Sequence, residues 1–309
     1  MSRGPGPAPR VRFIEVGPRD GLQNLSQPLA TERKLELVKG ALAAGCDLVE
    51  PTSMVSPKWV PQLADAEELL RRLLAEDPDR ADRLRVLVPN LKGLERALAA
   101  GARRVIVNVG VTDGFNRHNL NRSVEETLGE IARVAEAAAR TGCPWDASLS
   151  VAFGCPYEGR VEPREVAHLA ARLAGLGAGE LSLADTIGVA GPSEIEAVVE
   201  LVAERVPRER LSLHLHDTRG MGLANALTGY RLGISRFEGS VGGIGGCPFA
   251  PRSTGNVCSE DLLHLLQRLG ASGKASVAAL CDLAQRLEGW LGHPLPGRLY
   301  RAGVWDVEA

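Results

Sequence analysis

Two histidines in one short segment are the residues of this sequence best suited to chemistry. Over residues 211–216, leucines alternate with Ser212, His214 and His216. Strict alternation is typical of a β-strand, and side chains two positions apart project from the same face of a strand. Two imidazoles on one face either take separate hydrogen-bond partners in a polar pocket or share a divalent cation. The segment alone does not decide between these interpretations.

The elements that would position these histidines alternate between strand and helix along most of the chain. The expected strands are residues 11–16, 47–50, 84–88, 104–109, 146–152, 180–183, 211–216 and 236–241. Segments of helical periodicity follow them, at residues 31–44, 65–74, 91–100, 124–140, 163–176, 192–206, 223–232 and 259–269. Eight such units in about 260 residues predict an α/β protein with a closed (β/α)8 barrel of the TIM type. An open doubly wound sheet is the alternative, although no Gly-x-Gly-x-x-Gly follows the first strand.

The predicted barrel accounts for residues 11–270. Residues 1–10 are rich in glycine and proline and lack an apolar signal core, so we expect a disordered lead-in. Residues 271–309 are expected to form a helical extension, with a helix over 277–291, packed on the barrel.

Composition excludes several classes of function. A net charge of −2 argues against a nucleic-acid partner and a membrane-surface role, and no apolar run is long enough to span a bilayer. The six cysteines show no Cys-x-x-Cys spacing, which disfavours a zinc knuckle. A chain of this length does not need disulfides, so we expect a reducing cytoplasm.

Polar residues stand at the ends of several predicted strands, where a barrel carries its active site. They are Arg19, Asp20, Glu50, Asn90, Asp185, His214 and His216, and a glycine-rich run precedes Cys247. Buried charges are costly unless they are paired or bound to a metal, so their convergence on one mouth indicates a site. A carboxylate with two imidazoles suits Mg²⁺ or Mn²⁺ and leaves positions open for substrate oxygens. Zinc fits the ligand types as well.

Several motifs, in this order along the chain, resemble those of 3-hydroxy-3-methylglutaryl-CoA (HMG-CoA) lyases. They are VGPRDGLQN (16–24), TSMVSPKWVPQ (52–62), PNLKG (89–93), GCPYEG (154–159), DTIG (185–188), HLHD (214–217), GGCP (245–248) and GN (255–256). The resemblance extends from about residue 11 to about residue 270. It implies the barrel fold and a retro-aldol cleavage that yields acetyl-CoA and a keto acid, acetoacetate for the HMG-CoA lyases.

The resemblance also implies a role for each matching residue. Asp20, His214, His216 and Asn256 would hold the divalent cation, Mg²⁺ or Mn²⁺. Arg19 would bind substrate and stabilise the thioester enolate, and Glu50 would orient Arg19 or the metal ligands. His214 would accept the hydroxyl proton, a task that Asp20 or Asp185 could share. Cys247 would protonate the departing enolate carbon.

The sequence departs from this family where the substrate walls are expected. Residues 108–115 replace a Phe-Gly-Ala-Ala-Ser segment, Asp146-Ala-Ser148 replaces Arg-Gly-Tyr, and Arg219-Gly-Met221 replaces Tyr-Gly-Gln. We therefore expect Thr112, Ser148 and Arg219 to contact substrate. Because Asp146 stands where the family has an arginine, we expect the mouth to lose a positive charge and Asp146 to repel a substrate carboxylate. Arg219 or Arg117 would then receive that carboxylate.

These departures keep other functions open. A lyase for a related 3-hydroxy-3-methyl acyl-CoA, such as citramalyl-CoA, is the first alternative. A Claisen-condensing synthase would need a further C-terminal domain, and about 40 residues after Gly270 leave little room for one. An inactive metal-binding scaffold is disfavoured because Asp20, Asn256 and Cys247 are all present. We expect an acyl-CoA substrate, no nucleic-acid or membrane partner, and a homodimer formed through the C-terminal helix.

Overall fold

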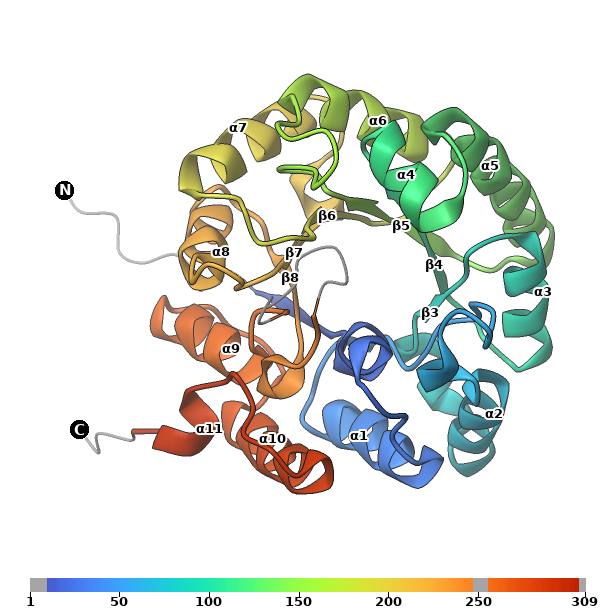
Figure 1. Cartoon of the computed structure of the whole chain (residues 1–309). Coiled ribbons are helices and arrows are strands. Elements are labelled where there is room, and N and C mark those ends of the chain that lie inside the picture. Colours follow the sequence, from blue (N-terminus) through green and yellow to red (C-terminus); the bar gives the residue numbers. More distant parts are fainter. Residues whose placement is uncertain (1–9, 247–254, 306–309) are drawn as a thin grey trace.

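Eight parallel strands lie at the centre of the molecule and helices surround them (Figure 1). The computed structural model describes residues 10–246 and 255–305. Its strands are β1 (Arg12–Glu15), β2 (Leu48–Val49), β3 (Val86–Leu87), β4 (Val105–Gly110), β5 (Trp145–Ser150), β6 (Leu181–Asp185), β7 (Leu211–Leu215) and β8 (Arg236–Gly239). They are hydrogen-bonded in the order β2-β1-β8-β7-β6-β5-β4-β3.

Irregular pairing between β2 and β3 closes this sheet. Single bridges join Val49 to Leu84 and Ser53 to Leu87, and the amide of Arg85 donates to the carbonyl of Val49 over 2.9 Å. The predicted (β/α)8 barrel is therefore confirmed. Because the pairing across this seam is interrupted, β2 and β3 contain only two residues each, fewer than the sequence pattern predicts.

The helices that follow the strands lie where their periodicity predicts. They are α1 (Thr31–Ala43), α2 (Ala66–Glu76), α3 (Leu91–Ala99), α5 (Val124–Thr141), α6 (Pro163–Gly175), α7 (Pro192–Ala203), α8 (Gly222–Arg231) and α9 (Ser259–Arg268). Local sequence fixes their ends, as α5 illustrates. It begins with a reciprocal capping box between Ser123 and Glu126, and it ends at Gly142, whose φ of +66° suits glycine.

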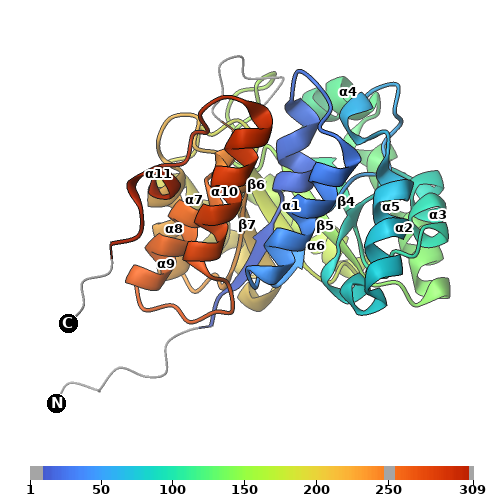
Figure 2. The same ribbon diagram turned by 90° about the horizontal axis from the view of Figure 1, so that it is seen from below.

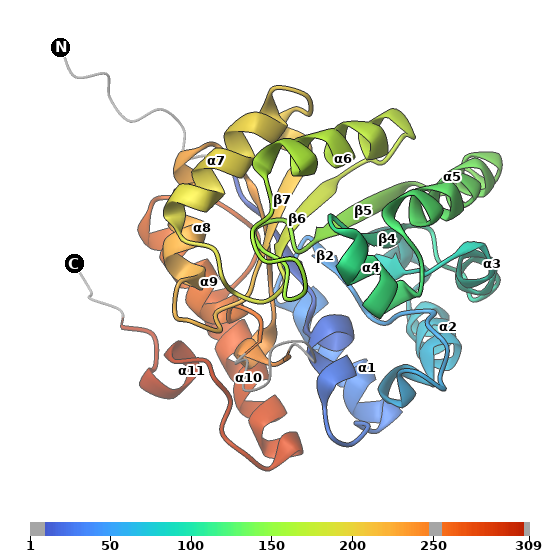
Figure 3. The same ribbon diagram turned by 45° about the horizontal axis from the view of Figure 1, so that its top comes forward.

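Helix α4 (Asp113–Leu120) is an addition that the sequence pattern did not predict. It starts at Thr112, whose hydroxyl oxygen accepts a hydrogen bond from the amide of Phe115 over 3.3 Å, and it ends at Asn121. Its residues show no apolar stripe, so hydrophobic periodicity gives no sign of it. The helix follows β4 directly and lies at the end of the barrel to which the strands point, inside the ring of longer helices (Figures 1 and 3).

The C-terminal residues pack on the barrel, as expected. Helix α10 (Val277–Leu291) lies beside α1 and α9, and the short α11 (Leu299–Ala302) lies outside it (Figures 1 and 2). Gly40 of α1 allows this close approach, since a Cβ there would lie 2.6 Å from a methyl carbon of Leu283. The predicted helix over 277–291 is confirmed. Within the described ranges, we find no helix with the length and apolar character that a membrane span requires.

Candidate metal and active site

Three side chains bring their ligand atoms to a common point inside the barrel mouth. The candidate ligand atoms of Asp20, His214 and His216 all lie within 4.8 Å of one another, and the three residues are buried. The two imidazole Nε2 atoms are 3.2 Å apart, and each is 3.8 Å from Oδ2 of Asp20. Two ring nitrogens that face each other beside a carboxylate form a donor set that fits a divalent cation.

The ligands come from β1 and β7, the two strands that flank β8 in the sheet. His214 and His216 alternate along β7 and its extension, as predicted, so that both project into the interior. Asp20 lies in the tight turn that follows β1, over Gly17–Gly21. Gly21 is required in this turn because a Cβ there would meet Ile244 at 2.6 Å.

Asn256 joins the cluster from the chain that follows β8. It forms a backbone bridge with His216, and its side-chain amide donates to Oδ2 of Asp20 over 2.8 Å and to the carbonyl of Ile244 over 3.2 Å. The structure therefore places next to Asp20 a residue that only the family resemblance had suggested. Its amide oxygen is a donor type that Mg²⁺ and Mn²⁺ accept.

Asp20 is held by cationic and amide groups. The guanidinium of Arg19 donates to Oδ1, and the amide of Gln23 donates to the same oxygen over 2.8 Å. Burial alone would raise the pKa of Asp20, but the Arg19 guanidinium and the two imidazoles hold it well below its usual range. Asp20 is therefore ionised at neutral pH, as a metal ligand must be.

His214 has an anionic partner that the sequence did not suggest. Its Nδ1 lies 3.0 Å from Oε2 of Glu238, a buried residue of β8. Burial alone would lower the pKa of His214, but Glu238 and Asp20 outweigh burial and raise it. A carboxylate on Nδ1 fixes the ring orientation and leaves Nε2 directed toward the cluster.

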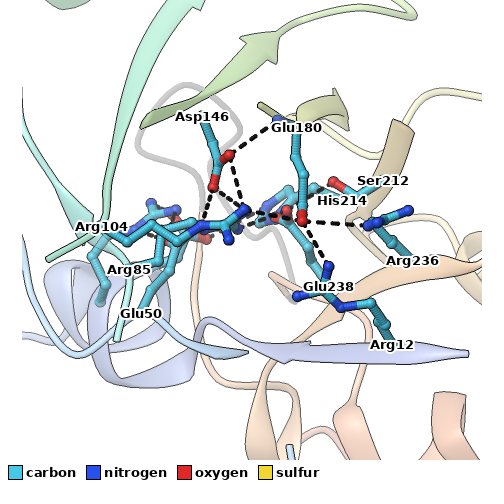
Figure 4. A network of polar contacts seen from close by, with 12 residues as sticks. Arg12, Glu50, Arg85, Arg104, Asp146, Glu180, Ser212, His214, Arg236 and Glu238 are labelled. Atoms are coloured by element: carbon cyan, nitrogen blue, oxygen red, sulfur yellow. Dashed lines mark hydrogen bonds and ion pairs between the residues drawn. The ribbon is translucent and has the colours of Figure 1, made fainter. Parts of the chain in front are cut away.

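Glu50 supports Arg19, as predicted. Its Oε2 accepts a hydrogen bond from Nε of Arg19 over 2.7 Å, and its Oε1 accepts from Nε and Nη2 of Arg85 over 3.0 and 2.6 Å. Nη2 of Arg85 also donates to Glu238 over 2.9 Å. Figure 4 shows Glu50, Arg85 and Glu238 of this network together with His214.

A cavity of about 470 Å³ opens above the cluster at the barrel mouth. Arg19, Asp20, His214 and His216 line one side of it. The side formed by β3 to β6 and α4 is neutral and is lined by Leu87, Asn108, Phe115, Leu120, Ser148, Ser150, Ala184 and Thr186. Trp59 stands at the cavity with its side chain 84% exposed. The predicted contact residue Ser148 therefore faces the cavity.

Two other predicted contact residues do not line this cavity. The hydroxyl of Thr112 donates to Sγ of Cys155 over 3.0 Å at the start of α4. Arg219 is exposed, and its guanidinium donates to the carbonyls of Ile187 and Gly188, both over 2.9 Å. Both side chains therefore bond nearby groups of the protein. From the segment 108–115 that contains Thr112, Asn108 lines the cavity instead.

Asp185 is also turned away from the cavity. Its two carboxylate oxygens accept hydrogen bonds from the amides of Val189 and Ala190 over 2.9 and 3.1 Å. Burial raises its pKa despite these bonds. The side chain shapes the turn after β6 and does not contact His214 or Asp20. Cys247 lies outside the described residues.

The expectation for Asp146 is wrong. It is the second residue of β5, is 1% exposed, and accepts hydrogen bonds from Arg104 over 2.8 and 3.0 Å inside the barrel (Figure 4). It cannot repel a substrate carboxylate because it lies too deep along the strand to line the cavity. The guanidinium of Arg85 comes within 3.7 Å of it, so a neighbouring segment supplies the charge that β5 lacks.

The sequence pattern did not predict three residues that support the cluster, Gln23, Arg85 and Glu238, or the cavity-lining Asn108. A signal for two of them exists in the sequence. Arg85 and Glu238 are opposite charges within short apolar strand segments, and opposite charges buried in the interior of one barrel are expected to pair. Gln23 and Asn108 carry no comparable signal, since both are neutral residues in turns or strand ends.

Comparison with known proteins agrees with this site. A family model described as HMGL-like matches residues 10–287. The 3-hydroxy-3-isohexenylglutaryl-CoA/hydroxy-methylglutaryl-CoA lyase of Pseudomonas aeruginosa is 43% identical over 293 residues, covering 95% of this chain and 97% of that protein. The (R)-citramalyl-CoA lyase of Chloroflexus aurantiacus is 40% identical over 300 residues, or 95% of each chain.

The fold agrees as closely as the sequence. The crystal structure of the Bacillus subtilis HMG-CoA lyase matches with a TM-score of 0.92 and 39% identity, covering 96% of this chain and 99% of that one. Identity at this level over nearly the full length of both chains is accompanied here by the same barrel and a complete set of candidate ligands. This chain therefore belongs to the HMG-CoA lyase family of carbon–carbon lyases.

Proposed function

We propose that this chain is a divalent-cation-dependent lyase that cleaves HMG-CoA to acetyl-CoA and acetoacetate. The observation that carries the proposal is the convergence of Asp20, His214 and His216 on the floor of a cavity that Arg19 also lines. A cation site beside a guanidinium provides for both halves of the reaction, an ionising hydroxyl and an enolate oxygen that gains negative charge.

The cleavage requires one proton to leave and another to be supplied. The tertiary hydroxyl loses its proton, its oxygen becomes the ketone of acetoacetate, and the bond between the carbinol carbon and the thioester α-carbon breaks. The electron pair of that bond forms the thioester enolate, whose α-carbon then takes up a proton to give acetyl-CoA. A cation bound at the cluster would lower the pKa of the hydroxyl.

The residues of the site divide these tasks. Asp20, His214, His216 and Asn256 would hold Mg²⁺ or Mn²⁺, with Glu238 fixing the ring of His214. We assign the hydroxyl proton to the pair formed by Asp20 and His214, whose Oδ2 and Nε2 lie 3.8 Å apart.

We assign the stabilisation and the protonation of the enolate to Arg19 and Cys247. Arg19, oriented by Glu50, would face its oxygen, since a fixed guanidinium stabilises a developing anion most strongly in a site that excludes water. Cys247 is our candidate for the proton donor to the α-carbon.

The neutral cavity wall favours a second candidate substrate. Citramalyl-CoA carries its carboxylate directly on the carbinol carbon and would yield acetyl-CoA and pyruvate, so its carboxylate lies one methylene closer to the cluster than that of HMG-CoA. Among the described residues that line the cavity, Arg19 is the only arginine or lysine. The similarity to the citramalyl-CoA lyase of Chloroflexus aurantiacus also supports this candidate.

A product assay separates the two candidates. Purified protein with Mg²⁺ or Mn²⁺ is given HMG-CoA and citramalyl-CoA in parallel, and acetyl-CoA, acetoacetate and pyruvate are measured. We expect acetyl-CoA and acetoacetate in equal amounts from HMG-CoA, with Cys247→Ala as the slow control. Preferential release of pyruvate from citramalyl-CoA would reassign the substrate and keep the reaction class, whereas no cleavage of either would refute both.

A further inference from the structure

Arg85 lies inside the barrel and is neither a candidate metal ligand nor one of the residues that line the cavity. The residue directly precedes β3, and its side chain is fully buried. Its Nη2 donates to Oε1 of Glu50 over 2.6 Å and to Oε1 of Glu238 over 2.9 Å, so one nitrogen joins the two carboxylates (Figure 4). Its Nε adds a second bond to Glu50 over 3.0 Å.

Each of these carboxylates holds a functional group with its other oxygen. Oε2 of Glu50 accepts from Nε of Arg19 over 2.7 Å, and Oε2 of Glu238 lies 3.0 Å from Nδ1 of His214. The five residues therefore form one chain of alternating charge. It connects the guanidinium on one side of the cluster to the imidazole on the other, and Arg85 is its middle member.

We propose that Arg85 is a positioning residue that sets the relative placement of Arg19 and His214 by holding Glu50 and Glu238. The mechanistic meaning of that placement rests on the proposed function. Without Arg85, the buried carboxylates of Glu50 and Glu238 would no longer share a cation. Removal of one partner of a buried ion pair leaves an uncompensated charge, and this costs much more free energy than the intact pair contributes to stability. The carboxylates would separate or turn, and the side chains bonded to them would follow.

Lysine cannot replace this arrangement. The planar fork of arginine reaches two carboxylates at once in a fixed geometry, whereas an ammonium group is a single point charge on a flexible stem. Arg85→Lys would restore the charge but not the fixed spacing between Glu50 and Glu238.

A neighbouring arginine provides a matched control. Nη1 of Arg85 has no hydrogen-bond partner in the described part of the chain, and its nearest anion is Asp146, 3.7 Å away. Arg104 bonds Asp146 over 2.8 and 3.0 Å and pairs with Glu180 over 3.0 Å. In the described part of the chain, Arg104 therefore bonds neither Glu50 nor Glu238, although it belongs to the same network of polar contacts (Figure 4).

The test compares Arg85→Met, Arg85→Lys and Arg104→Met in the full chain. Mn²⁺ affinity is measured by calorimetry, kcat and KM are measured for the substrate identified above, and folding is checked by circular dichroism and thermal melting. We expect Arg85→Met to weaken Mn²⁺ binding and lower kcat by roughly 10- to 100-fold with little change in KM, as other supporting residues of metal sites do. Arg85→Lys should fall between it and the wild type, and Arg104→Met should keep wild-type affinity and kcat.

Folded Arg85→Met with wild-type Mn²⁺ affinity and wild-type kcat would overturn the proposal, and so would an equal loss in Arg104→Met. If Arg85→Met does not fold, Arg85→Lys decides: wild-type values refute the proposal, and a reduced affinity with a wild-type melting temperature supports it. The Mn²⁺ titration needs no substrate, so its outcome is independent of whether HMG-CoA is cleaved.

Discussion

Asp20 lies close to every other candidate ligand and to Arg19. Arg19 and Gln23 bond one of its oxygens, Asn256 bonds the other, and both imidazoles lie 3.8 Å from that second oxygen. Opposite charges on several sides compensate for the cost of burying a carboxylate, and they keep it ionised. A residue so placed contributes to metal binding and to the orientation of Arg19 at the same time.

The two histidines should be distinguishable by substitution. His214 has both ring nitrogens committed, to Glu238 and to the cluster, so His214→Gln should reduce Mn²⁺ affinity and also lower kcat measured at saturating Mn²⁺. His216→Gln should reduce Mn²⁺ affinity by at least about 10-fold, since a direct ligand contributes more than its supporting residues, with most of kcat restored by excess Mn²⁺. Full restoration of His214→Gln by excess Mn²⁺ would mean that His214 is a ligand with no part in proton transfer.

Asn108 should influence the choice of substrate. Asn108 lines the cavity and its Oδ1 accepts a hydrogen bond from the hydroxyl of Ser150 over 2.7 Å, so we expect its amide NH₂ to be the group that donates to substrate. Asn108→Leu should raise KM for the carboxylate-bearing acyl-CoA by roughly 10-fold, the value of one or two hydrogen bonds to a charged group. The melting temperature should be unchanged, and an unchanged KM would remove Asn108 from the substrate wall.

The sequence predicts which side chains share a face of a strand better than it predicts how deep in the barrel each one lies. The alternation around His214 and His216 identified the metal face because a strand has a period of two. The same reasoning could not place Asp146, because a strand residue near its amino end lies in the barrel interior and only the last residues reach the mouth. Asp185 and Arg219 follow strands as catalytic residues do, yet their side chains bond nearby backbone groups.

At the scale of elements, two buried glutamates fasten the turn after β8 to its neighbours. Glu15, at the end of β1, accepts hydrogen bonds from the amides of Gly17 and Val241 over 2.8 and 3.0 Å and from the hydroxyl of Ser259 over 2.5 Å. Glu260, in the first turn of α9, accepts from the amide of Gly242 over 3.1 Å. The turn so held leads toward the segment that carries Asn256.

These glutamates should make stability depend on pH. Burial raises the pKa of Glu15 and that of Glu260 to about 7. A carboxyl whose pKa is raised in the folded state favours folding while it is protonated, and this contribution is lost as pH rises from the unfolded value near 4.5 through 7. Glu260→Gln removes the contribution of Glu260. Between pH 5 and pH 8, the unfolding free energy of Glu260→Gln should therefore rise relative to that of the wild type by about 2.5 kcal/mol.

Urea unfolding at pH 5, 6, 7 and 8 measures this difference. Glu136→Gln, on an exposed position of α5, is the control, and its curve should run parallel to that of the wild type. If the Glu260→Gln curve is also parallel to the wild-type curve, Glu260 does not titrate in this range. In that case the fastening of the turn does not depend on pH.

At the scale of the whole molecule, the repeated alternation of strand and helix in the sequence predicts the fold. Eight strand-and-helix units predicted the barrel because consecutive parallel strands are joined by helical crossovers. Eight such helices form a ring that covers the outer face of a closed sheet. Helix α4 could not be predicted, since it covers the mouth and buries only part of one side, including Phe115 and Asn116. The seam between β2 and β3 could not be predicted either, because it consists of single bridges between irregular segments.

A cation bound by residues from the first strand and from the seventh should stabilise the whole fold, because these strands are far apart in the sequence. Asp20 follows β1 and the histidines belong to β7 and its extension, so Mn²⁺ would bind the folded chain and not the unfolded one. At a concentration 100 times its Kd, Mn²⁺ should add about 2.7 kcal/mol to the free energy of unfolding. Differential scanning calorimetry with and without Mn²⁺ should show a higher Tm, and Asp20→Asn should abolish the increase while retaining a cooperative transition. A Tm that Mn²⁺ leaves unchanged in the wild type would contradict this expectation.

The cluster of Asp20, His214 and His216 should bind the cation on which cleavage depends. The most direct measurement is the rate of acetyl-CoA release from HMG-CoA by metal-stripped protein during titration with Mn²⁺, in the wild type and in Asp20→Asn. We predict no release before Mn²⁺ is added and a saturable rise in the wild type. The plateau in Asp20→Asn should be at least 100-fold lower, a larger loss than removal of a supporting residue causes. Release by the stripped wild type at the full rate, or wild-type release by Asp20→Asn, would contradict this prediction.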